Sequence, residues 1–212
     1  MTHIPAGLTV AVLDYPEGAE GGAIDATRDA LAQLGAIAFA TADPAEALAA
    51  DGLVVAGRGP APAAAKSLAS VMGERIVGQR LAGARPVLAT GTGMQVLFEQ
   101  VDAKSKGFGE WPGGVEKLDA QLESAHVSPA PDSELLHGVD PAAEFDFHAG
   151  AGVREFALDE DDFIAYPRLS WVQELHVLAA VENGALWATQ FHPETSGEAG
   201  AAVLGNWLRQ LG

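Results

Sequence analysis

Two short segments carry side chains whose types and spacing suit acyl-transfer chemistry. In the first, residues 88–95, a buried strand is expected to turn sharply into a helix, with small residues on both sides of Gly91 at its tip. Such a turn presents the tip residue in the way that many hydrolases present a nucleophile. In the second, His192 is followed two residues later by Glu194, a pair that suits a general base oriented by a carboxylate.

The first half of the chain predicts the elements that position these segments. Short apolar runs predict a buried strand at residues 8–14 and further strands at 36–41, 53–56 and 86–90. Apolar periodicity and capping residues predict helices at 23–34, 43–50, 61–81 (broken near Gly73 and Gly78) and 94–99. This alternation predicts parallel βαβ units in a three-layer, flavodoxin-like α/β open sheet with helices on both faces. Both segments then lie at the carboxyl ends of strands, where such sheets place their sites.

The second half contains more Gly, Pro and Asp and predicts shorter strands. Candidates lie at residues 144–147, 178–182 and 185–191, and the last two are separated by Asn183-Gly184, a strong hairpin signal. We therefore expect additional antiparallel strands in this half, followed by a final helix at 198–211. No internal repeat or linker is evident, so residues 1–212 are predicted to form a single domain.

The charge balance limits the classes of partner. With 29 acidic and 12 basic residues, the chain carries a formal net charge of −17, which repels phosphate backbones and argues against nucleic-acid binding. The acidic surface either steers the protein to a basic partner or reflects a generally acidic proteome. No apolar run has membrane-spanning length and the first residues lack a signal-type pattern, so we expect no membrane association and a cytoplasmic location.

Cysteine is absent from the chain, which excludes disulfides, thiolate metal sites and a cysteine nucleophile. The histidines at 126, 137, 148 and 176 show no metal-ligand spacing. The acidic run at residues 159–162 lacks the spaced ligands and the glycine of a calcium loop. We therefore expect neither a metal site nor a cofactor.

Taken together, the two segments resemble class I glutamine amidotransferases, which carry a Gly-x-Cys-x-Gly turn and a late His-Pro-Glu motif. More narrowly, the chain is similar to the glutaminase subunits of imidazole glycerol phosphate synthase. The similarity covers most of the chain, and the matching stretches are residues 12–15, Gly57 with Gly59, 93–95, 97–99, 145–147 and 187–194. The last stretch is the most specific of them.

The resemblance implies roles for individual residues. His192 corresponds to the base and Glu194 to its orienting acid, while Gln95 and Glu99 correspond to positions that line the glutamine pocket. The loop Gly57-Arg58-Gly59 corresponds to the segment whose backbone N–H groups build the oxyanion hole. The side chain of Arg58 is unusual there, and it either binds an anion or is a solvated loop arginine.

The chain departs from the family at the position that matters most, because the resemblance places Gly91 where the catalytic cysteine stands. Glycine has no side chain to attack a carboxamide. Thr90 and Thr92 flank the tip, but neighbouring residues point their side chains in different directions, and a hydroxyl also needs a base aimed at it. Glycine reaches the strained dihedrals of such a turn with little steric penalty, so we predict a relaxed turn and a retained fold.

Further positions on the same face differ from the family pattern. The first glycine of the turn is Ala89, the family proline beside Arg58 is missing, and residues 149–151 replace a His-Ser-Tyr motif, with His148 one position early. Because these positions changed together, we predict that glutamine hydrolysis is absent or severely impaired.

Three functions remain open. The resemblance implies an amidotransferase-like subunit in histidine biosynthesis, which forms a heterodimer with the cyclase subunit of imidazole glycerol phosphate synthase and supports a reaction fed by free ammonia. The alternative is a stand-alone pseudoenzyme that binds glutamine or another small metabolite as a sensor. The third is a hydrolase that uses another nucleophile.

Overall fold

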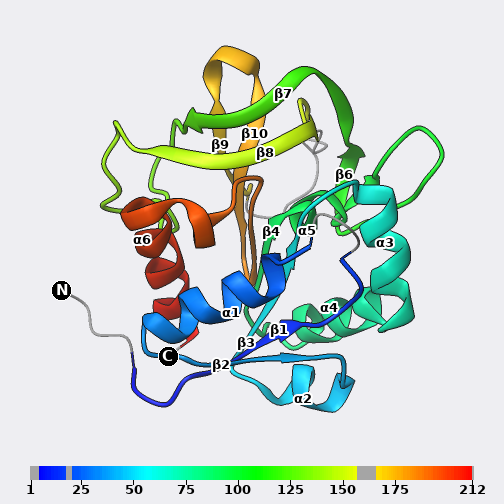
Figure 1. The fold of residues 1–212 in the computed structure, drawn as a ribbon, viewed down its shortest axis with the longest axis vertical. Helices are drawn as coiled ribbons and strands as arrows, with labels where there is room; N and C mark the ends of the chain where they lie inside the picture. The colour runs from blue at the N-terminus through cyan, green and yellow to red at the C-terminus, as the bar shows by residue number, and fades with distance from the viewer. Residues whose placement is uncertain (1–4, 18–20, 157–165, 212) are drawn as a thin grey trace.

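A seven-stranded sheet with the order β2-β1-β3-β4-β11-β10-β9 forms the centre of the computed structural model, which describes residues 5–17, 21–156 and 166–211 (Figure 1). Five strands run parallel: β2 (Ile37–Thr41), β1 (Thr9–Leu13), β3 (Gly52–Gly57), β4 (Val87–Gly91) and β11 (Leu186–Thr189). The two remaining strands, β10 (Val177–Asn183) and β9 (Arg168–Val172), are antiparallel. This order, with its reversal between β1 and β3, is flavodoxin-like.

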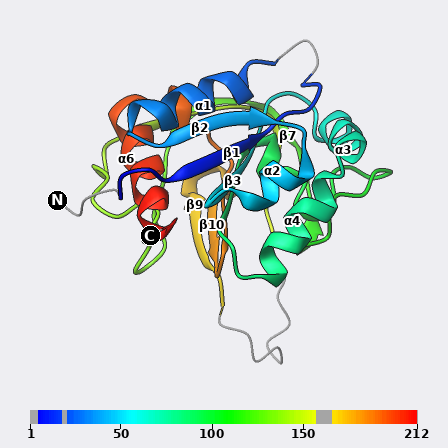
Figure 2. The same cartoon turned by 90° about the horizontal axis from the view of Figure 1, so that it is seen from below.

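Helices cover both faces of the sheet, as Figures 1 and 2 show from two directions. On one face lie α1 (Ala23–Gln33) and α6 (Gly197–Leu208), and on the other lie α2 (Pro44–Ala49), α3 (Ala61–Ser70) and α4 (Gly73–Ala82). The short 3-10 helices are η1 (Gln173–Leu175), η2 (Pro193–Thr195) and η3 (Arg209–Leu211). The predicted three-layer fold, with antiparallel strands added in the second half, is confirmed.

The helix predicted at 61–81 is interrupted at Met72, whose φ is 57°, next to the break expected near Gly73, whereas α4 continues without a break through Gly78. A second predicted helix differs from the structure. The helix predicted at 94–99 is wrong beyond its first turn: α5 spans Thr92–Gln95, and Phe98–Gln100 forms the strand β5. The cause is pairing with a later segment, since β5 pairs in parallel with β6 (Trp111–Gly114). An apolar run of this length fits either state until its partner is known.

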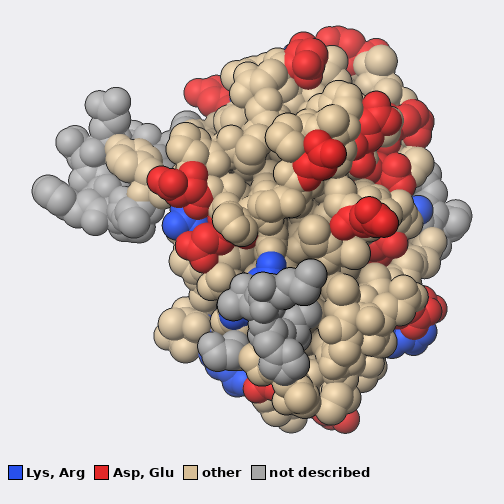
Figure 3. Space-filling view, turned by 90° about the vertical axis from the view of Figure 1, so that its left-hand side faces the viewer, with Lys and Arg blue, Asp and Glu red and all other residues tan. Residues whose placement is uncertain are grey.

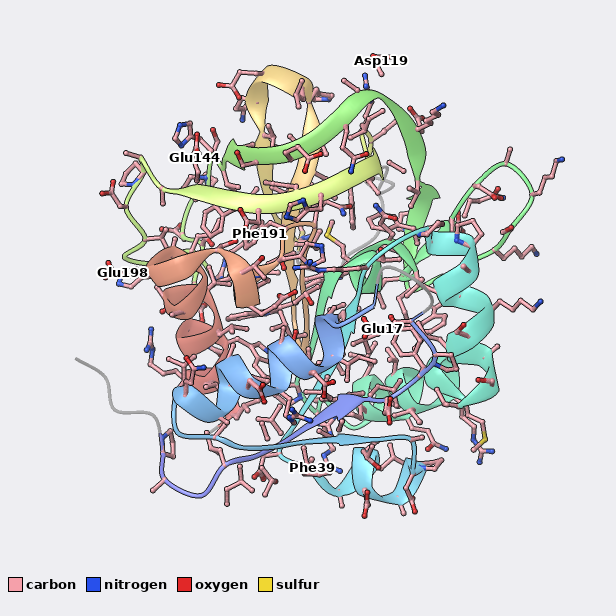
Figure 4. All side chains as sticks on the ribbon, viewed as in Figure 1. Glu17, Phe39, Asp119, Glu144, Phe191 and Glu198 are labelled. Atoms are coloured by element: carbon pink, nitrogen blue, oxygen red, sulfur yellow. The ribbon has the colours of Figure 1, made fainter. Side chains whose placement is uncertain are left out.

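A second antiparallel pair, β7 (Glu116–His126) with β8 (Glu144–Gly152), passes over the upper end of the central sheet (Figure 1). Its inner face is apolar: Phe145 and Phe147 pack on Phe191, with ring centroids 4.2 and 5.8 Å away. Figure 4 shows Phe191 beneath this pair, whereas Asp119 and Glu144 lie on its outer side. We call β7 and β8 the roof of the molecule.

The sequence did not predict β7, because its buried positions do not alternate. Leu118 and Leu122 lie on one face and are buried, but Ala120 between them is exposed, whereas a regular half-buried strand buries every second residue. The pairing with β8 shifts register twice, between Lys117 and Leu122 and between Leu122 and Ser124. These irregularities change which side chains face inward and remove the two-residue period by which strands are recognised.

The surface carries the acidic excess that the composition indicates. Figure 3 shows one face of the molecule, on which acidic side chains outnumber basic ones and lie mostly in its upper half, toward the roof. Within the described residues, no helix combines the length and the apolar character needed to cross a membrane.

At the opposite end of the sheet from the roof, a buried arginine joins several elements. The guanidinium of Arg80, on α4, is fully buried and donates to the carbonyls of Ala47 (3.1 Å), Ala50 (2.9 Å), Asp51 (2.8 Å) and Pro86 (3.0 Å). These carbonyls belong to the end of α2 and to the segments that lead into β3 and β4. Burial, with a smaller contribution from Arg85, lowers the pKa of Arg80 to about 10, so the group is still protonated at neutral pH.

Replacing Arg80 with leucine is therefore expected to destabilise the fold strongly. It would remove a donor from four carbonyls, of which those of Ala50 and Pro86 keep another donor in Arg85 and in the backbone N–H of Leu53. Each buried polar group left unsatisfied costs about 1–3 kcal/mol. We expect the free energy of unfolding in urea to fall by at least about 3 kcal/mol. Arg75→Leu is the matched control, because Arg75 is exposed on the same helix; equal losses in the two variants would contradict the role assigned to Arg80.

Candidate functional site

The site lies where β3 and β4 end side by side, with Gly57 and Gly91 as partners in the register. At Gly91 the chain leaves β4 and enters α5 with φ 58° and ψ −124°. Residues with a side chain rarely adopt such dihedrals, and holding one there costs on the order of 1–3 kcal/mol. The sharp strand-to-helix turn expected from the sequence is therefore present, and glycine occupies its tip.

The space around Gly91 is already filled. A Cβ atom at this position would lie 2.3 Å from Cε1 of His192 and 2.5 Å from the carbonyl oxygen of Gly57. Both distances are far below van der Waals contact. The imidazole thus occupies the space that the first atom of any side chain at position 91 would need.

His192 is held by contacts within its own segment and by one contact with the roof. Its Nδ1 lies 3.0 Å from Oε1 of Glu194, and both side chains are almost fully buried. Its backbone N–H donates to the carbonyl of Asp146 on the roof (2.7 Å), and its carbonyl accepts from the hydroxyl of Ser196 (2.7 Å). Because an ionised carboxylate only accepts hydrogen bonds, Nδ1 of His192 is the donor in this contact, and in the neutral imidazole the lone pair is then on Nε2.

Arg58 reaches across the site toward the same carboxylate. Its terminal nitrogen lies 3.8 Å from Oε1 of Glu194 and 3.5 Å from the hydroxyl of Thr195. The side chain of Glu194 is 0% exposed and that of Arg58 is 27% exposed, so the pair is only partly screened by solvent. Neither of the two expectations for Arg58 describes this contact, since its guanidinium pairs with a buried protein carboxylate and links the loop after β3 to η2.

A cavity of about 370 Å³ opens beside these residues. Gln95 on α5 lies in its wall and donates from its amide nitrogen to the carbonyl of Ala151 (2.8 Å) and to Oε1 of Gln190 (3.1 Å). The polar side chains that line the cavity are Thr92, Gln95, Asp102, Lys117, Gln121, His148, Gln190 and His192. The structure therefore brings together Gln95, His192 and Gly59 around one space.

Glu99 does not belong to this group. It is exposed on β5, and its carboxylate accepts a hydrogen bond from the backbone N–H of Gly113 at 3.3 Å. The expectation that Glu99 lines the pocket came from the family resemblance. Since the segment is a strand with Phe98 buried, alternation turns the next side chain outward.

The sequence does not single out four of the lining residues, three of which lie on the roof. Lys117 and Gln121 belong to β7, whose irregular pattern hides its strand character. Gln190 stands within the His-Pro-Glu segment and was not singled out. The spacing of His148 along the chain does not indicate a role in the cavity. Its neighbours in space are set by the path of β8 across the end of the sheet, which the sequence does not reveal.

No group of three or more His, Cys, Asp or Glu side chains within the described ranges is arranged to hold a metal ion. The acidic run at 159–162, which was weighed as a calcium loop, lies outside the described residues.

The fold and the site define the class of protein, and comparison with solved structures agrees. A glutamine amidotransferase structure superimposes with a TM-score of 0.69 at 20% identity, covering 95% of this chain and 97% of that one. A glutamine amidotransferase from Thermotoga maritima gives a TM-score of 0.60 at 14% identity over 90% of this chain and 77% of that one. The chain thus has the fold of the glutamine amidotransferases.

Sequence relatives narrow the class. Imidazole glycerol phosphate synthase subunit HisH from Corynebacterium glutamicum is 43% identical over 96% of this chain and 99% of its own length. The protein of the same name from Nocardia farcinica is 44% identical over 96% of this chain and 98% of its own. A scan against protein-family models found no match. At this identity and coverage, the chain belongs to the family of imidazole glycerol phosphate synthase HisH subunits.

Adding a side chain at Gly91 is expected to destabilise the protein. Gly91→Ala places a methyl group against His192 and Gly57, so it combines backbone strain with overpacking, each on the order of 1–3 kcal/mol. Gly91→Cys should cost at least as much. We expect the free energy of unfolding to fall by about 3 kcal/mol or more, measured by urea denaturation.

Gly138→Ala is the matched control for the alanine variant. Gly138 also has a positive φ, 72°, but no atom lies within 4 Å of a Cβ built there. It should therefore show the backbone strain alone. A melting temperature of the Gly91 variants equal to or above that of the unmodified protein would refute the crowding argument.

The contact between Arg58 and Glu194 is expected to appear as a coupling in stability. Arg58→Met removes a charge beside a buried carboxylate, whereas the same change in a Glu194→Gln background removes much less. We expect a coupling energy of about 0.5–3 kcal/mol in the double-mutant cycle. Arg154→Met is the control, because its partner Asp119 is 99% exposed, and a coupling no larger than for that surface pair would count against the contact.

Proposed function

We propose that this protein is the amidotransferase-like subunit of an imidazole glycerol phosphate synthase in histidine biosynthesis, and that it does not hydrolyse glutamine. The family membership supports the first part. The second part rests on one observation, the imidazole of His192 lying where a side chain at position 91 would begin. In this proposal Gly91 stands in place of the nucleophilic cysteine, and His192 with Glu194 keeps the arrangement of a base and its orienting acid without a nucleophile to serve.

Alternative nucleophiles find no support around the turn. The hydroxyl of Thr92 donates to the carbonyl of Gly59 at 2.7 Å, so its proton is held away from His192. Thr90 is fully buried within β4. A hydroxyl attacks a carboxamide only when a base removes its proton, and neither threonine is hydrogen-bonded to His192. The chain has no cysteine elsewhere to take over the role.

Retention of the fold supports a role in assembly. The relatives are named as subunits of a synthase, and this chain spans almost their whole length with its central sheet and roof in place. We propose that the protein pairs with the cyclase subunit as a heterodimer and that free ammonia feeds the cyclase reaction. The residues of the former site then serve stability, as the buried Glu194 with its two partners illustrates.

A specific observation favours a second candidate, a binding module. The 370 Å³ cavity falls within the size range of small-molecule sites, and its wall combines apolar groups with the amides of Gln95 and Gln190. Such a cavity suits an amino acid or another small polar metabolite. In this reading the protein binds its ligand without turning it over.

One experiment separates the two candidates. The protein is mixed with the cyclase subunit of its own organism and analysed by size-exclusion chromatography, and the complex is then assayed with glutamine and, separately, with ammonium salt. The C. glutamicum relative with its own cyclase is run in parallel. We expect a 1:1 complex that is active with ammonia and shows no glutaminase activity above the buffer rate.

Other outcomes have definite meanings. Glutamine hydrolysis by the complex that disappears in His192→Ala would refute the loss of activity. Failure to form a complex would refute the subunit role, and a thermal shift with glutamine but without cyclase would then favour the binding module.

A further inference from the structure

Two imidazole–carboxylate pairs from distant parts of the chain meet at the same cavity. Nδ1 of His192 lies 3.0 Å from Glu194, and Nδ1 of His148, on β8, lies 2.8 Å from Oε2 of Glu123 on β7. The two rings have centroids 6.3 Å apart with an angle of 37° between their planes. Both histidines line the cavity. His148 has no part in the function proposed above.

The two carboxylates set the chemistry of the rings. A carboxylate beside Nδ1 accepts a hydrogen bond from that nitrogen, and in the neutral imidazole the lone pair is then on Nε2. An imidazole whose second nitrogen donates to a carboxylate is the usual form of a metal-bound histidine, since the carboxylate fixes the tautomer and raises the basicity of the other nitrogen. Each ring at this cavity already has that support.

The separation of the rings is compatible with a shared ion. A transition metal lies about 2.0–2.1 Å from a histidine nitrogen, which puts it about 3.2 Å from the ring centroid. Two rings on one ion have centroids about 5.2 Å apart at a tetrahedral angle and up to about 6.4 Å apart when the ion lies on a line between them. The observed distance of 6.3 Å is close to the linear limit, so binding of tetrahedral Zn²⁺ requires the rings to approach by about 1 Å. His148 is 47% exposed, so its side chain has room to rotate toward a narrower angle at the metal.

The backbone at His148 adds an independent observation. Its φ is 47°, although it lies in the middle of a strand and is not a glycine. A backbone in this region costs on the order of 1–3 kcal/mol and tends to persist at functional sites. The residues that follow it on β8, Ala149, Gly150 and Ala151, are small and leave the cavity in front of the rings open.

We propose that this cavity binds a divalent transition-metal ion, such as Zn²⁺ or Cu²⁺, through Nε2 of His148 and of His192. The described residues offer no third His, Cys, Asp or Glu to complete such a group, so water or a small ligand fills the remaining positions. The formal charge of −17 favours the approach of a cation. The site does not depend on the fate of glutamine hydrolysis.

The test is titration with Zn²⁺ by isothermal calorimetry, in a buffer that contains excess Mg²⁺ to occupy the acidic surface. We expect saturable 1:1 binding that weakens at least tenfold in His148→Asn, a residue that tolerates a positive φ. Glu123→Gln should weaken it about tenfold or more, as loss of a supporting carboxylate does. Thermal denaturation of each variant without metal verifies that it is folded.

His126→Asn is the matched control. His126 lies on β7 of the same roof, is 56% exposed and has Glu144 3.8 Å from its ring, but it does not line the cavity. Its replacement should leave Zn²⁺ binding unchanged. Absence of saturable binding, or equal losses in the His126 and His148 variants, would overturn the proposal.

A spectroscopic readout tests the ligands directly. With one equivalent of Cu²⁺, electron paramagnetic resonance should show coupling to two imidazole nitrogens in the unmodified protein and to one in His148→Asn. A spectrum with oxygen ligands only, or one unaffected by the substitution, would place the ion on the acidic surface and refute the site.

Discussion

The close contact between the end of β4 and the imidazole of His192 constrains the whole site. Parallel pairing of β3 and β4 fixes Gly57 beside Gly91, and β11 on the other side of β4 delivers His192 to the same point. A Cβ atom at position 91 would meet both neighbours below 2.6 Å. Since all three strands are buried in the sheet, the backbone has little freedom to relieve such an overlap. A glycine at the tip and an inward imidazole therefore depend on one another.

The surroundings of Glu194 illustrate how such a site stays stable. A buried carboxylate is costly unless it is paired and hydrogen-bonded, and here the imidazole of His192 and the guanidinium of Arg58 both lie against Oε1, whereas the buried Oε2 has no hydrogen-bond partner among the described residues. Arg58 stands on the loop after β3, so the ion pair also ties that loop to η2. The residue that looks least suited to an oxyanion loop thereby pairs with the carboxylate beside His192. Arg58, His192 and Glu194 thus form one connected group around a buried carboxylate.

The roof takes part both in the site around His192 and in the metal site proposed at the same cavity. It closes the cavity, contributes His148 and Glu123, and holds His192 through the carbonyl of Asp146. The second imidazole pair therefore lies at the same cavity as the first, and both depend on the position of the roof.

Much of the fold could be predicted from local patterns. Buried apolar runs predicted four of the parallel strands, Asn183-Gly184 predicted the β10–β11 hairpin, and the spacing of His192 and Glu194 predicted their pairing, because each signal lies within a few residues of what it determines. The missing cysteine follows from composition alone. Only the tertiary structure decided the rest: β7 with its register shifts, the outward direction of Glu99, the reach of Arg58 to Glu194, and the meeting of His148 with His192. These depend on which distant strands pair and in what register, and local propensity carries no information about that.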